Sequence, residues 1–344
     1  MRAALIKAFG EPTEVLELAD VPEPSGPAAG EVLIGVEYAP VNMNDLYVIQ
    51  GAFPVRPSLP SIVGNEGVGR VLAVGGGVEH PKVGDRVLIP LYAFSWRERL
   101  VVPAAGLFSL PEAEPQQLAM LGINPPTASL LLDEASDLKP GDWVVQNAAN
   151  SGVGRSLIAI AKARGIKTIN LVRRPELIPE LQAIGGDLVV VDEDGAPDKI
   201  RAAVGNGRVP LATDGVAGKS SAMIAGALSE HGIFVVYAYM GGGPVAINPF
   251  DLIVKRIVVK GFFLNHPDIG RRFTRRYEKP YRSSLPARFR CPLRQPILFP
   301  HCVKRFFTPR GAERCSSIFA ERPEPKTTRN RQSGRLTVWG ERLK

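Results

Sequence analysis

The chain has 344 residues, of which 45% are hydrophobic and 22% charged, a composition typical of a soluble globular protein with room for two domains. It contains no run of 18 apolar residues, which argues against a membrane span, and the N-terminal stretch MRAALIKAFG lacks the long apolar segment of a signal peptide. We therefore expect a cytoplasmic protein without a membrane partner.

The net charge of +8 is distributed unevenly along the chain. Residues 271–344 carry 20 Lys and Arg against 5 Asp and Glu, whereas residues 1–270 carry 22 against 29. The three cysteines, Cys291, Cys302 and Cys315, also lie in the basic segment, so the main body has neither disulfides nor thiolate metal ligands. Because the main body is mildly acidic, we do not expect it to bind nucleic acid.

Residues 1–117 are predicted to form a β-rich domain. Short apolar or alternating stretches, such as EVLIGVEYAPVN and GVGRVLAVG, are separated by Gly and Pro turns. This pattern is typical of a barrel or a sandwich.

Residues 118–268 are predicted to form a doubly wound α/β domain. Predicted strands (WVVQNAA, TINLVRR, DLVVVDE, VPLATDGV, GIFVVYAYMG and IVVKGFFL) are interleaved with predicted helices such as GVGRSLIAIAKARG and SSAMIAGALSEHG. Alternating strands and helices indicate a parallel sheet. The stretch QQLAMLGINPPTASLLLDEA is predicted to be helical, with a break at Pro125 and Pro126.

Residues 269–344 form a basic tail that does not continue this pattern. From residue 271 onward the tail has eight prolines, no aspartate and clustered arginines, without a period of 2 or 3.6 residues. Three interpretations stay open: a disordered tail, a nucleic-acid-binding segment, and a segment translated in a shifted reading frame.

The stretch NAANSGVGRS (147–156) is the better of two candidates for a phosphate-binding loop. It follows a predicted strand and opens a predicted helix, so its N–H groups can face a pyrophosphate. The motif G-x-G-x-x-G keeps only its third glycine, Gly154, and the strand–turn–helix context therefore carries the prediction. The other candidate, SIVGNEGVGRV (61–71), leads into a strand, and its Glu66 would repel phosphate. An ordinary turn of small residues is the alternative for residues 147–156.

Two arginines at the end of the next predicted strand indicate which nicotinamide cofactor is bound. Arg173 and Arg174 stand where an acidic residue would accept hydrogen bonds from the 2′-hydroxyl of NAD. A guanidinium group instead suits the 2′-phosphate of NADPH. We therefore predict NADPH, with two solvated surface arginines as the alternative.

The chain resembles the medium-chain dehydrogenase/reductases, which join a GroES-like β-rich catalytic domain to a Rossmann domain. Zinc-dependent members of this family carry Gly-His-Glu where this chain reads Gly64-Asn65-Glu66, and an earlier cysteine where Asn42 stands. The resemblance therefore implies a zinc-free branch with no metal ligands.

Within that branch, the chain is most similar to the mitochondrial-type 2-enoyl thioester reductases. The resemblance rests on NMNDLYVIQGAFP, PSIVGNEGVGRVLAVG, FSWRERLVV, LGINPPTA, VVQNAANSGVG, NLVRRPE, GKSSAMI and KGFFL, which occur in this order and cover about residues 1–266. It implies reduction by NADPH of a carbon–carbon double bond conjugated to a thioester carbonyl, as in enoyl-CoA or enoyl-ACP. The hydride goes to the β-carbon, and the resulting enolate is protonated at the α-carbon.

The resemblance also implies a set of cofactor-binding residues around the predicted loop and the strand ends. They are Asn124, Thr127, Asn150, Ser151, Gly152, Val153, Arg173, Arg174, Tyr237, Ala238, Tyr239, Met240, Phe262, Phe263 and Leu264.

The family's active-site tyrosine is replaced in this chain. Its position falls on Phe53, which has no hydroxyl to donate to a carbonyl, so a role as pocket-lining hydrophobe is the alternative. Tyr47 and Tyr92 are candidate substitutes, although the sequence does not place either of them. Asn42 and Asp45 complete the set of candidate catalytic residues.

Three functions therefore stay open. The first is an enoyl thioester reductase, the second an NADPH:quinone or enone reductase of the same branch, and the third an inactive homologue that binds nucleic acid through its basic tail. We also expect a homodimer, because the apolar strand IVVKGFFL would lie at the edge of its sheet and an exposed apolar edge favours pairing with a second subunit.

Overall fold

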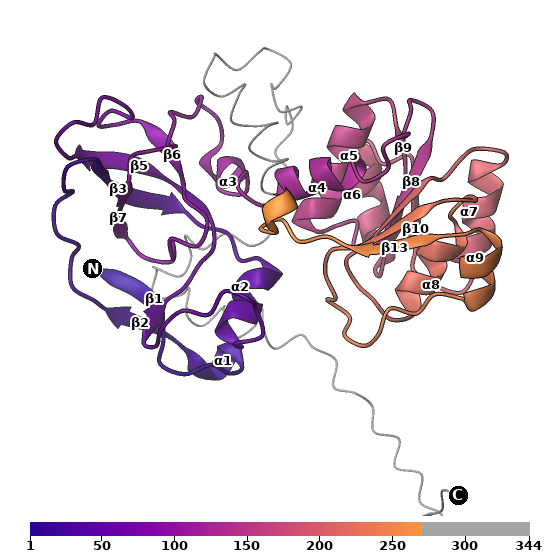
Figure 1. Ribbon diagram of the computed structural model, residues 1–344, viewed down its shortest axis with the longest axis horizontal. Coiled ribbons are helices and arrows are strands. Elements are labelled where there is room, and N and C mark those ends of the chain that lie inside the picture. The colour runs from indigo at the N-terminus through magenta and orange to yellow at the C-terminus, as the bar shows by residue number, and fades with distance from the viewer. Residues whose placement is uncertain (270–344) are drawn as a thin grey trace, which may run out of the picture.

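The computed structural model describes residues 1–269, which form a β-rich body and an α/β body joined by two helices (Figure 1). The interpretations of the basic tail concern residues outside this range. Among the described residues, no helix is both long enough and apolar enough to cross a membrane.

The β-rich body contains two antiparallel sheets, with strand orders β2-β1-β4 and β6-β5-β3-β7. Their strands are β1 (Arg2–Ile6), β2 (Leu16–Asp20), β3 (Glu31–Tyr38), β4 (Ser61–Ile62), β5 (Gly67–Val74), β6 (Arg86–Ile89) and β7 (Arg99–Pro103). Alternate side chains of these strands, including Ile34, Val71, Val87 and Leu100, form a buried core. The predicted β-rich domain is thus confirmed.

Two short helices interrupt the β-rich body, α1 (Pro12–Val15) and α2 (Met43–Ile49). The β-rich body therefore contains two helices that the strand pattern did not indicate. The signal for α2 is a capping box: Asn42 is its N-cap residue, and the backbone N–H of Asn42 donates to Asp45 Oδ2 at 2.7 Å.

The α/β body is built on a six-stranded parallel sheet with the order β10-β9-β8-β11-β12-β13. Its strands are β8 (Trp143–Gln146), β9 (Lys167–Val172), β10 (Leu188–Val191), β11 (Leu211–Asp214), β12 (Ile233–Val236) and β13 (Val258–Gly261). From β8 the chain runs outward to β10 and then returns to β11 on the other side of β8. The sheet therefore has its topological switch point between β8 and β11, where such sheets bind ligands.

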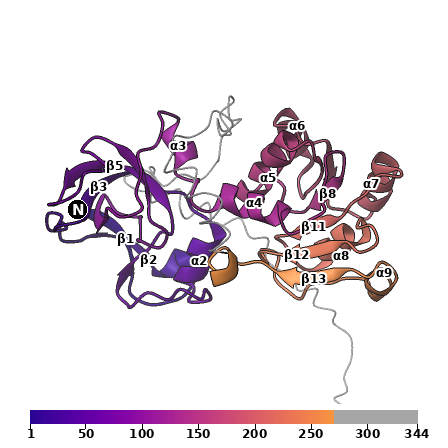
Figure 2. The ribbon, with the colours of Figure 1, turned by 45° about the horizontal axis from the view of Figure 1, so that its top comes forward.

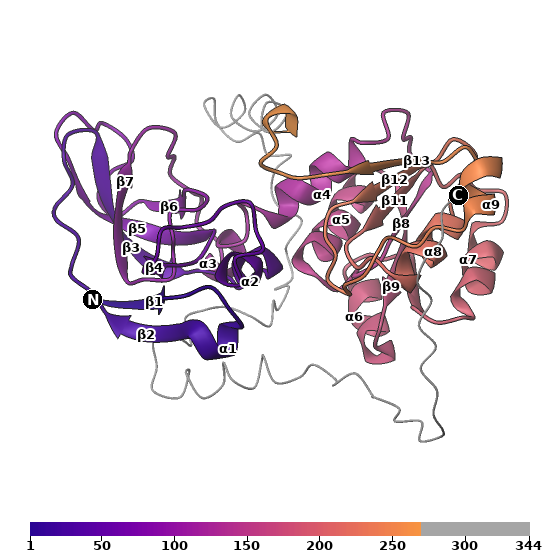
Figure 3. The ribbon, with the colours of Figure 1, turned by 60° about the horizontal axis from the view of Figure 1, so that its bottom comes forward.

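Helices cover both faces of this sheet (Figures 2 and 3). They are α5 (Gly152–Ala163), the 3₁₀ helix η1 (Pro175–Leu177), α6 (Ile178–Ala183), α7 (Ala196–Val204), α8 (Lys219–Gly226) and α9 (Pro249–Val254). Val144 of β8 packs in one apolar cluster with Leu157 of α5, whereas the next residue, Val145, packs in another with Ile200 and Ile224. Two cores on opposite faces confirm the predicted doubly wound fold.

The connection between the two bodies contains α3 (Pro115–Leu118) and α4 (Asn124–Leu132). The expected break at Pro125 and Pro126 is wrong, because both prolines lie in the first turn of α4. Proline is tolerated there, since the first helical residues have no intrahelical partner for an N–H group.

Gly154 explains why the third glycine of the loop motif is kept. A Cβ atom at this position would lie 2.6 Å from the carbonyl oxygen of Ala149. Only glycine therefore lets α5 start so close to the turn that follows β8, and this contact fixes the helix N-terminus above the switch point.

Candidate active site

The N-terminus of α5 supplies the geometry expected of a phosphate-binding loop. Ser151 is the N-cap residue, and its Oγ accepts a hydrogen bond from the N–H of Gly154 at 3.1 Å. An α-helix leaves its first N–H groups without intrahelical acceptors, so those of Gly152 and Val153 can face an anion. The buried hydroxyl of Tyr237, just after β12, lies beside the Ser151 side chain, and burial raises the pKa of Tyr237.

The two loops at the switch point are held together by buried hydrogen bonds. Asn147, after β8, donates from Nδ2 to Asp214 Oδ1 at 2.7 Å, and its Oδ1 accepts from the N–H of Gly215 at 2.8 Å. Asp214 also accepts from the N–H groups of Val216 and Ala217, both at 2.9 Å. These hydrogen bonds hold the loop after β8 and the loop after β11 together near the N-terminus of α5.

Both predicted phosphate-binding arginines lie at the carboxyl end of β9 and are exposed. β9 pairs in parallel with β8, with Asn170 opposite Gln146, so its carboxyl end lies beside the loop that leads into α5. Arg174 Nε lies 3.6 Å from Glu176 Oε1, an exposed ion pair that leaves its guanidinium in solvent. The exposed position of both arginines is compatible with binding a 2′-phosphate, and this role stays a prediction.

The structure places the other predicted cofactor residues at the same end of the sheet. Tyr237, Ala238, Tyr239 and Met240 follow β12, and Phe262, Phe263 and Leu264 follow β13, while Asn124 and Thr127 lie in α4. The ring of Phe262 packs in the core with α4 and α5, and its N–H donates to the carbonyl of Val236 at 2.8 Å. Its side chain therefore supports the sheet, whereas Phe263 is exposed.

A buried polar network connects the two bodies. Asn124 donates from Nδ2 to Asn42 Oδ1 at 3.1 Å, and Asn42 donates from its own Nδ2 to Glu66 Oε1 at 2.7 Å. The N–H of Ile123 donates to Glu66 Oε2 at 2.9 Å. A Cβ atom on Gly152 would lie 2.6 Å from Asn124 Oδ1, so the network reaches the N-terminus of α5.

Asp45 and Asn65 extend this network inside the β-rich body. The N–H of Asn65 donates to Asp45 Oδ1 at 2.8 Å. The Asn65 side chain is 1% exposed, and neither its Nδ2 nor its Oδ1 has a hydrogen-bond partner among the described residues. Buried amides are normally satisfied, so Asn65 stands out among the buried side chains of this network. Gly64 has a φ of +103°, and a Cβ there would lie 2.3 Å from Trp96 Cδ1, which explains why glycine precedes Asn65.

Burial changes the proton affinity of both carboxylates. Desolvation raises the pKa of Asp45 to about 7, although the N–H groups of Asn42 and Asn65 oppose the shift. Desolvation also raises the pKa of Glu66 to about 8, with a further contribution from the charge of Asp45. The pair therefore holds protons at pH values where carboxyl groups are ordinarily ionised.

This donor set does not suit the zinc ion that related dehydrogenases bind. Asn42 and Asn65 present amides, and both oxygens of Glu66 already accept hydrogen bonds. Zinc prefers thiolate, imidazole or free carboxylate ligands. Residues 1–269 also contain no cluster of three or more His, Cys, Asp and Glu side chains that could hold a metal.

Aromatic side chains from both bodies line the region beside the network. Phe53 contacts Phe263 edge to face, with ring centroids 5.8 Å apart, and Tyr92 in a tilted arrangement at 6.2 Å. Tyr47 of α2 stacks on Tyr239, with centroids 4.9 Å apart and an interplanar angle of 4°. Phe53 is thus brought together with one candidate substitute, Tyr92, whereas the other, Tyr47, contacts Tyr239.

Two asparagines in this region had no sequence signal. Asn44, in α2, and Asn265, after β13, both interact through their side chains with the Tyr92 hydroxyl. They are separated by more than half of the chain, and although Asn44 lies in the stretch NMNDLYVIQGAFP, nothing in the sequence pairs it with Asn265. Only the capping box of α2 indicated local structure around Asn44.

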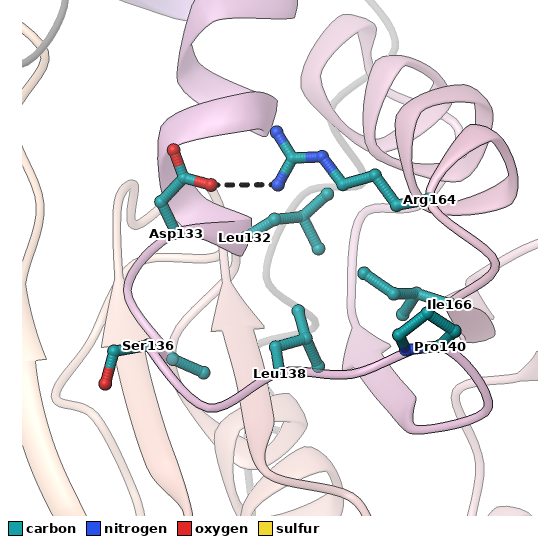
Figure 4. Close-up of a pocket in the computed structure, with 8 residues that line it drawn as sticks. Leu132, Asp133, Ser136, Leu138, Pro140, Arg164 and Ile166 are labelled. Atoms are coloured by element: carbon teal, nitrogen blue, oxygen red, sulfur yellow. Dashed lines mark hydrogen bonds and ion pairs between the residues drawn. The ribbon is translucent and has the colours of Figure 1, made fainter.

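A hollow in the α/β body is drawn in Figure 4. It has a volume of about 400 Å³ and is lined by Leu132, Asp133, Ala135, Ser136, Leu138, Pro140, Arg164 and Ile166. Arg164 caps the carboxyl end of α5 and forms an ion pair with Asp133 at 2.9 Å. At a rise of about 1.5 Å per residue, this end of α5 lies about 18 Å from Gly152. The hollow is therefore separate from the candidate active site.

The raised pKa values of Asp45 and Glu66 predict that stability falls as pH rises from about 5 to 9. In the unfolded chain both groups ionise near their ordinary values of 3.8 and 4.5, so over this range the folded state binds more protons. Each group can contribute up to about 1.4 kcal/mol per pH unit to the slope. Urea unfolding followed by tryptophan fluorescence at three pH values measures it.

The double variant Asp45→Asn, Glu66→Gln should flatten this slope, whatever its absolute stability. Asp198→Asn removes an exposed carboxylate of α7 and should keep the wild-type slope. Equal slopes for the wild type and the double variant would contradict the prediction.

Comparison with known proteins agrees with the fold and with the geometry of the site. Residues 28–112 match the Alcohol dehydrogenase GroES-like domain, and residues 152–278 match the Zinc-binding dehydrogenase domain. The enoyl-(acyl-carrier-protein) reductase, mitochondrial, of Caenorhabditis elegans is 37% identical over 270 residues, 77% of this chain and 77% of that protein. The human protein of the same name is 37% identical over 273 residues, 77% and 73% of the two chains.

Solved structures show the same relationship. The Etr1p complex with NADP and crotonyl-CoA has a TM-score of 0.71 at 27% identity, covering 81% of this chain and 88% of that chain. The Etr1p/Etr2p heterodimer from Candida tropicalis scores 0.72 at 27%, covering 83% and 86%. Escherichia coli quinone oxidoreductase complexed with NADPH scores 0.70 at 25%, covering 82% and 87%. With asparagines at Asn42 and Asn65, the chain belongs to the zinc-free branch of the medium-chain dehydrogenase/reductase superfamily.

Proposed function

We propose that the protein is a zinc-independent, NADPH-dependent reductase of the carbon–carbon double bond in 2-enoyl thioesters. The observation that carries the proposal is the continuous contact from Gly152 through Asn124 to Asn42, which joins the predicted cofactor loop to the buried polar network of the β-rich body. The enoyl reductases of C. elegans and human, and the Etr1p complex with NADP and crotonyl-CoA, support the same substrate class.

The chain's own residues would bind and orient the reactants. The first N–H groups of α5 suit a pyrophosphate, and Arg173 and Arg174 suit a 2′-phosphate. When bound there, NADPH would supply a hydride for the β-carbon of the substrate. Phe53 and Phe263 offer an apolar wall for an acyl chain. Because the donor set does not suit zinc, the negative charge that develops on the carbonyl oxygen has to be stabilised by hydrogen-bond donors.

Reduction of a quinone or an enone is the second candidate. Phe53 favours it, because a reduced quinone takes up protons from solvent more readily than an enolate carbon does and needs no tyrosine at position 53. The similarity to a quinone oxidoreductase complexed with NADPH points the same way.

Steady-state oxidation of NADPH separates the two candidates. With crotonyl-CoA and 1,4-naphthoquinone as alternative acceptors, we expect the kcat/KM for crotonyl-CoA to exceed that for the quinone by about ten-fold or more. The reverse ratio would favour the quinone reductase, and an inactive protein would contradict both.

Arg173→Ala and Arg174→Ala should each weaken NADPH use while leaving NADH use nearly unchanged. A lost charge-assisted hydrogen bond to the 2′-phosphate should raise the KM for NADPH by about ten-fold. Arg201→Ala is the matched control, because Arg201 is an exposed arginine of α7 that pairs with Asp198 at 2.7 Å. If the ratio of NADPH to NADH activity did not change in the two variants, the assignment of these arginines would be wrong.

We also propose that the protein is a homodimer that pairs through β13. β13 is an edge strand of the parallel sheet, and its Val258 and Val259 are 54% and 45% exposed. Phe250 and Ile253 of the neighbouring α9 are more exposed still, at 71% and 73%. An apolar edge of this kind favours association. The heterodimer formed by the structural relative Etr1p supports it.

Val259→Lys should shift the protein from dimer to monomer, because a lysine at the edge disfavours strand pairing. Size-exclusion chromatography with light scattering gives the molar mass directly. Val83→Lys places the same residue at a 60% exposed valine of the β-rich body and should leave the mass unchanged. A monomeric wild type, or a dimeric Val259→Lys variant, would contradict the proposal.

Two further expectations stay predictions. The protein was expected to be cytoplasmic, whereas the C. elegans and human relatives are named mitochondrial. The third hypothesis, an inactive homologue that binds nucleic acid through its basic tail, depends on residues that lie outside the described range.

A further inference from the structure

Phe53 occupies the position where the family carries a tyrosine, and its side chain has no hydroxyl group. If the protein reduces an enoyl thioester, hydride addition to the β-carbon moves negative charge onto the carbonyl oxygen. That oxygen needs a hydrogen-bond donor, and the side chain of Phe53 has none. Two tyrosines lie near enough to be considered, Tyr47 and Tyr92.

The two tyrosines have different surroundings. The ring of Tyr47 stacks on that of Tyr239 with an interplanar angle of only 4°. One face of the Tyr47 ring is therefore covered by a residue of the α/β body. The ring of Tyr92 instead lies 6.2 Å from that of Phe53, the position where the family carries its tyrosine. Tyr92 is therefore the tyrosine that adjoins position 53.

The backbone holds Tyr92 in an unusual conformation. Its φ is +62°, in the left-handed region that residues other than glycine rarely adopt. The N–H of Tyr92 donates to the carbonyl of Asn65 at 2.9 Å, and the N–H of Ser95 donates to that of Gly64 at 3.0 Å. These two hydrogen bonds bind the turn after β6 to the segment that carries Asn65 and its unpartnered amide.

The hydroxyl of Tyr92 lies where three segments meet. The side-chain amides of Asn44, in α2, and Asn265, after β13, both interact with it, and it is close enough to Asp45 and Glu66 to sense their charge. Burial, the largest cause, raises the pKa of Tyr92 to about 12. The hydroxyl therefore keeps its proton at neutral pH and can donate it in a hydrogen bond.

We propose that Tyr92 donates the hydrogen bond to the carbonyl oxygen of the substrate, in place of the tyrosine that the family carries at position 53. The geometry supports this role through the contact of Tyr92 with Phe53, the bonding of its backbone to Asn65 and the position of its hydroxyl between the two bodies. The proposal rests on the proposed enoyl thioester reductase function.

The test compares Tyr92→Phe with the wild type in NADPH-dependent reduction of crotonyl-CoA. This variant keeps the ring that packs on Phe53 and removes only the hydroxyl. We expect kcat/KM for crotonyl-CoA to fall by about 100-fold, as when one donor of an oxyanion site is lost. The Kd for NADPH, measured by fluorescence, should stay within about two-fold of the wild-type value. Tyr38→Phe removes a hydroxyl from a half-buried tyrosine of β3 whose apolar cluster includes neither Phe53 nor Phe263; it is the matched control and should keep wild-type activity.

A rescue variant separates a chemical role from a structural one. The double variant Tyr92→Phe, Phe53→Tyr restores a hydroxyl at the family's position and should recover at least about ten-fold of the lost kcat/KM. Recovery would not be expected if Tyr92 only supported the fold.

Other results would overturn the assignment. Wild-type kcat/KM in Tyr92→Phe, or a 100-fold loss confined to Tyr47→Phe, would remove Tyr92 from the mechanism while leaving the enoyl reductase function intact. A wild-type protein that binds NADPH but does not reduce crotonyl-CoA would overturn the proposed function, and this assignment with it.

Discussion

The carboxyl group of Glu66 is withdrawn from water at the junction of the two bodies, and the rest of the site is arranged around its hydrogen bonds. Its Oε1 accepts from Asn42 at the start of α2, and its Oε2 accepts from the backbone of Ile123 just before α4. A buried carboxylate without such donors would be strongly destabilising. The positions of α2 and α4 are thus coupled through one residue, and Asn124 extends the coupling to the loop before α5.

The same arrangement explains how the site can do without a metal. In a metal site, the cation balances buried acidic groups; here amides and backbone N–H groups do so. Asp45 accepts from the N–H groups of Asn42 and Asn65, and Glu66 accepts from side-chain amides as well as the backbone. Neutral donors compensate only part of the cost of burying a negative charge. The pKa values of Asp45 and Glu66 are therefore raised, because the uncharged form of each acid is favoured. A substrate carbonyl beside this network would therefore meet hydrogen-bond donors rather than a Lewis acid.

The features that the sequence predicted are those with local causes. The alternation of strands and helices follows from short-range periodicity, and the loop before α5 follows from the turn chemistry around Ser151 and Gly154. The two prolines before Thr127 were misread, because proline ends a helix or begins one depending on its position in the first turn. The contacts of Tyr92 with Asn44 and Asn265 could not be predicted, since they join residues that only the tertiary fold brings together.

Contacts between the two bodies also constrain how the reaction geometry is maintained. The stack of Tyr47 on Tyr239 and the contact of Phe53 with Phe263 each pair an aromatic residue of the β-rich body with one that follows a strand of the parallel sheet. A cofactor at α5 and a substrate beside Phe53 would be held by different bodies, so the distance between the reacting atoms depends on how these bodies pack. Because misplacement by about 1 Å can reduce a rate by about 100-fold, these aromatic contacts would help to maintain the geometry that hydride transfer needs.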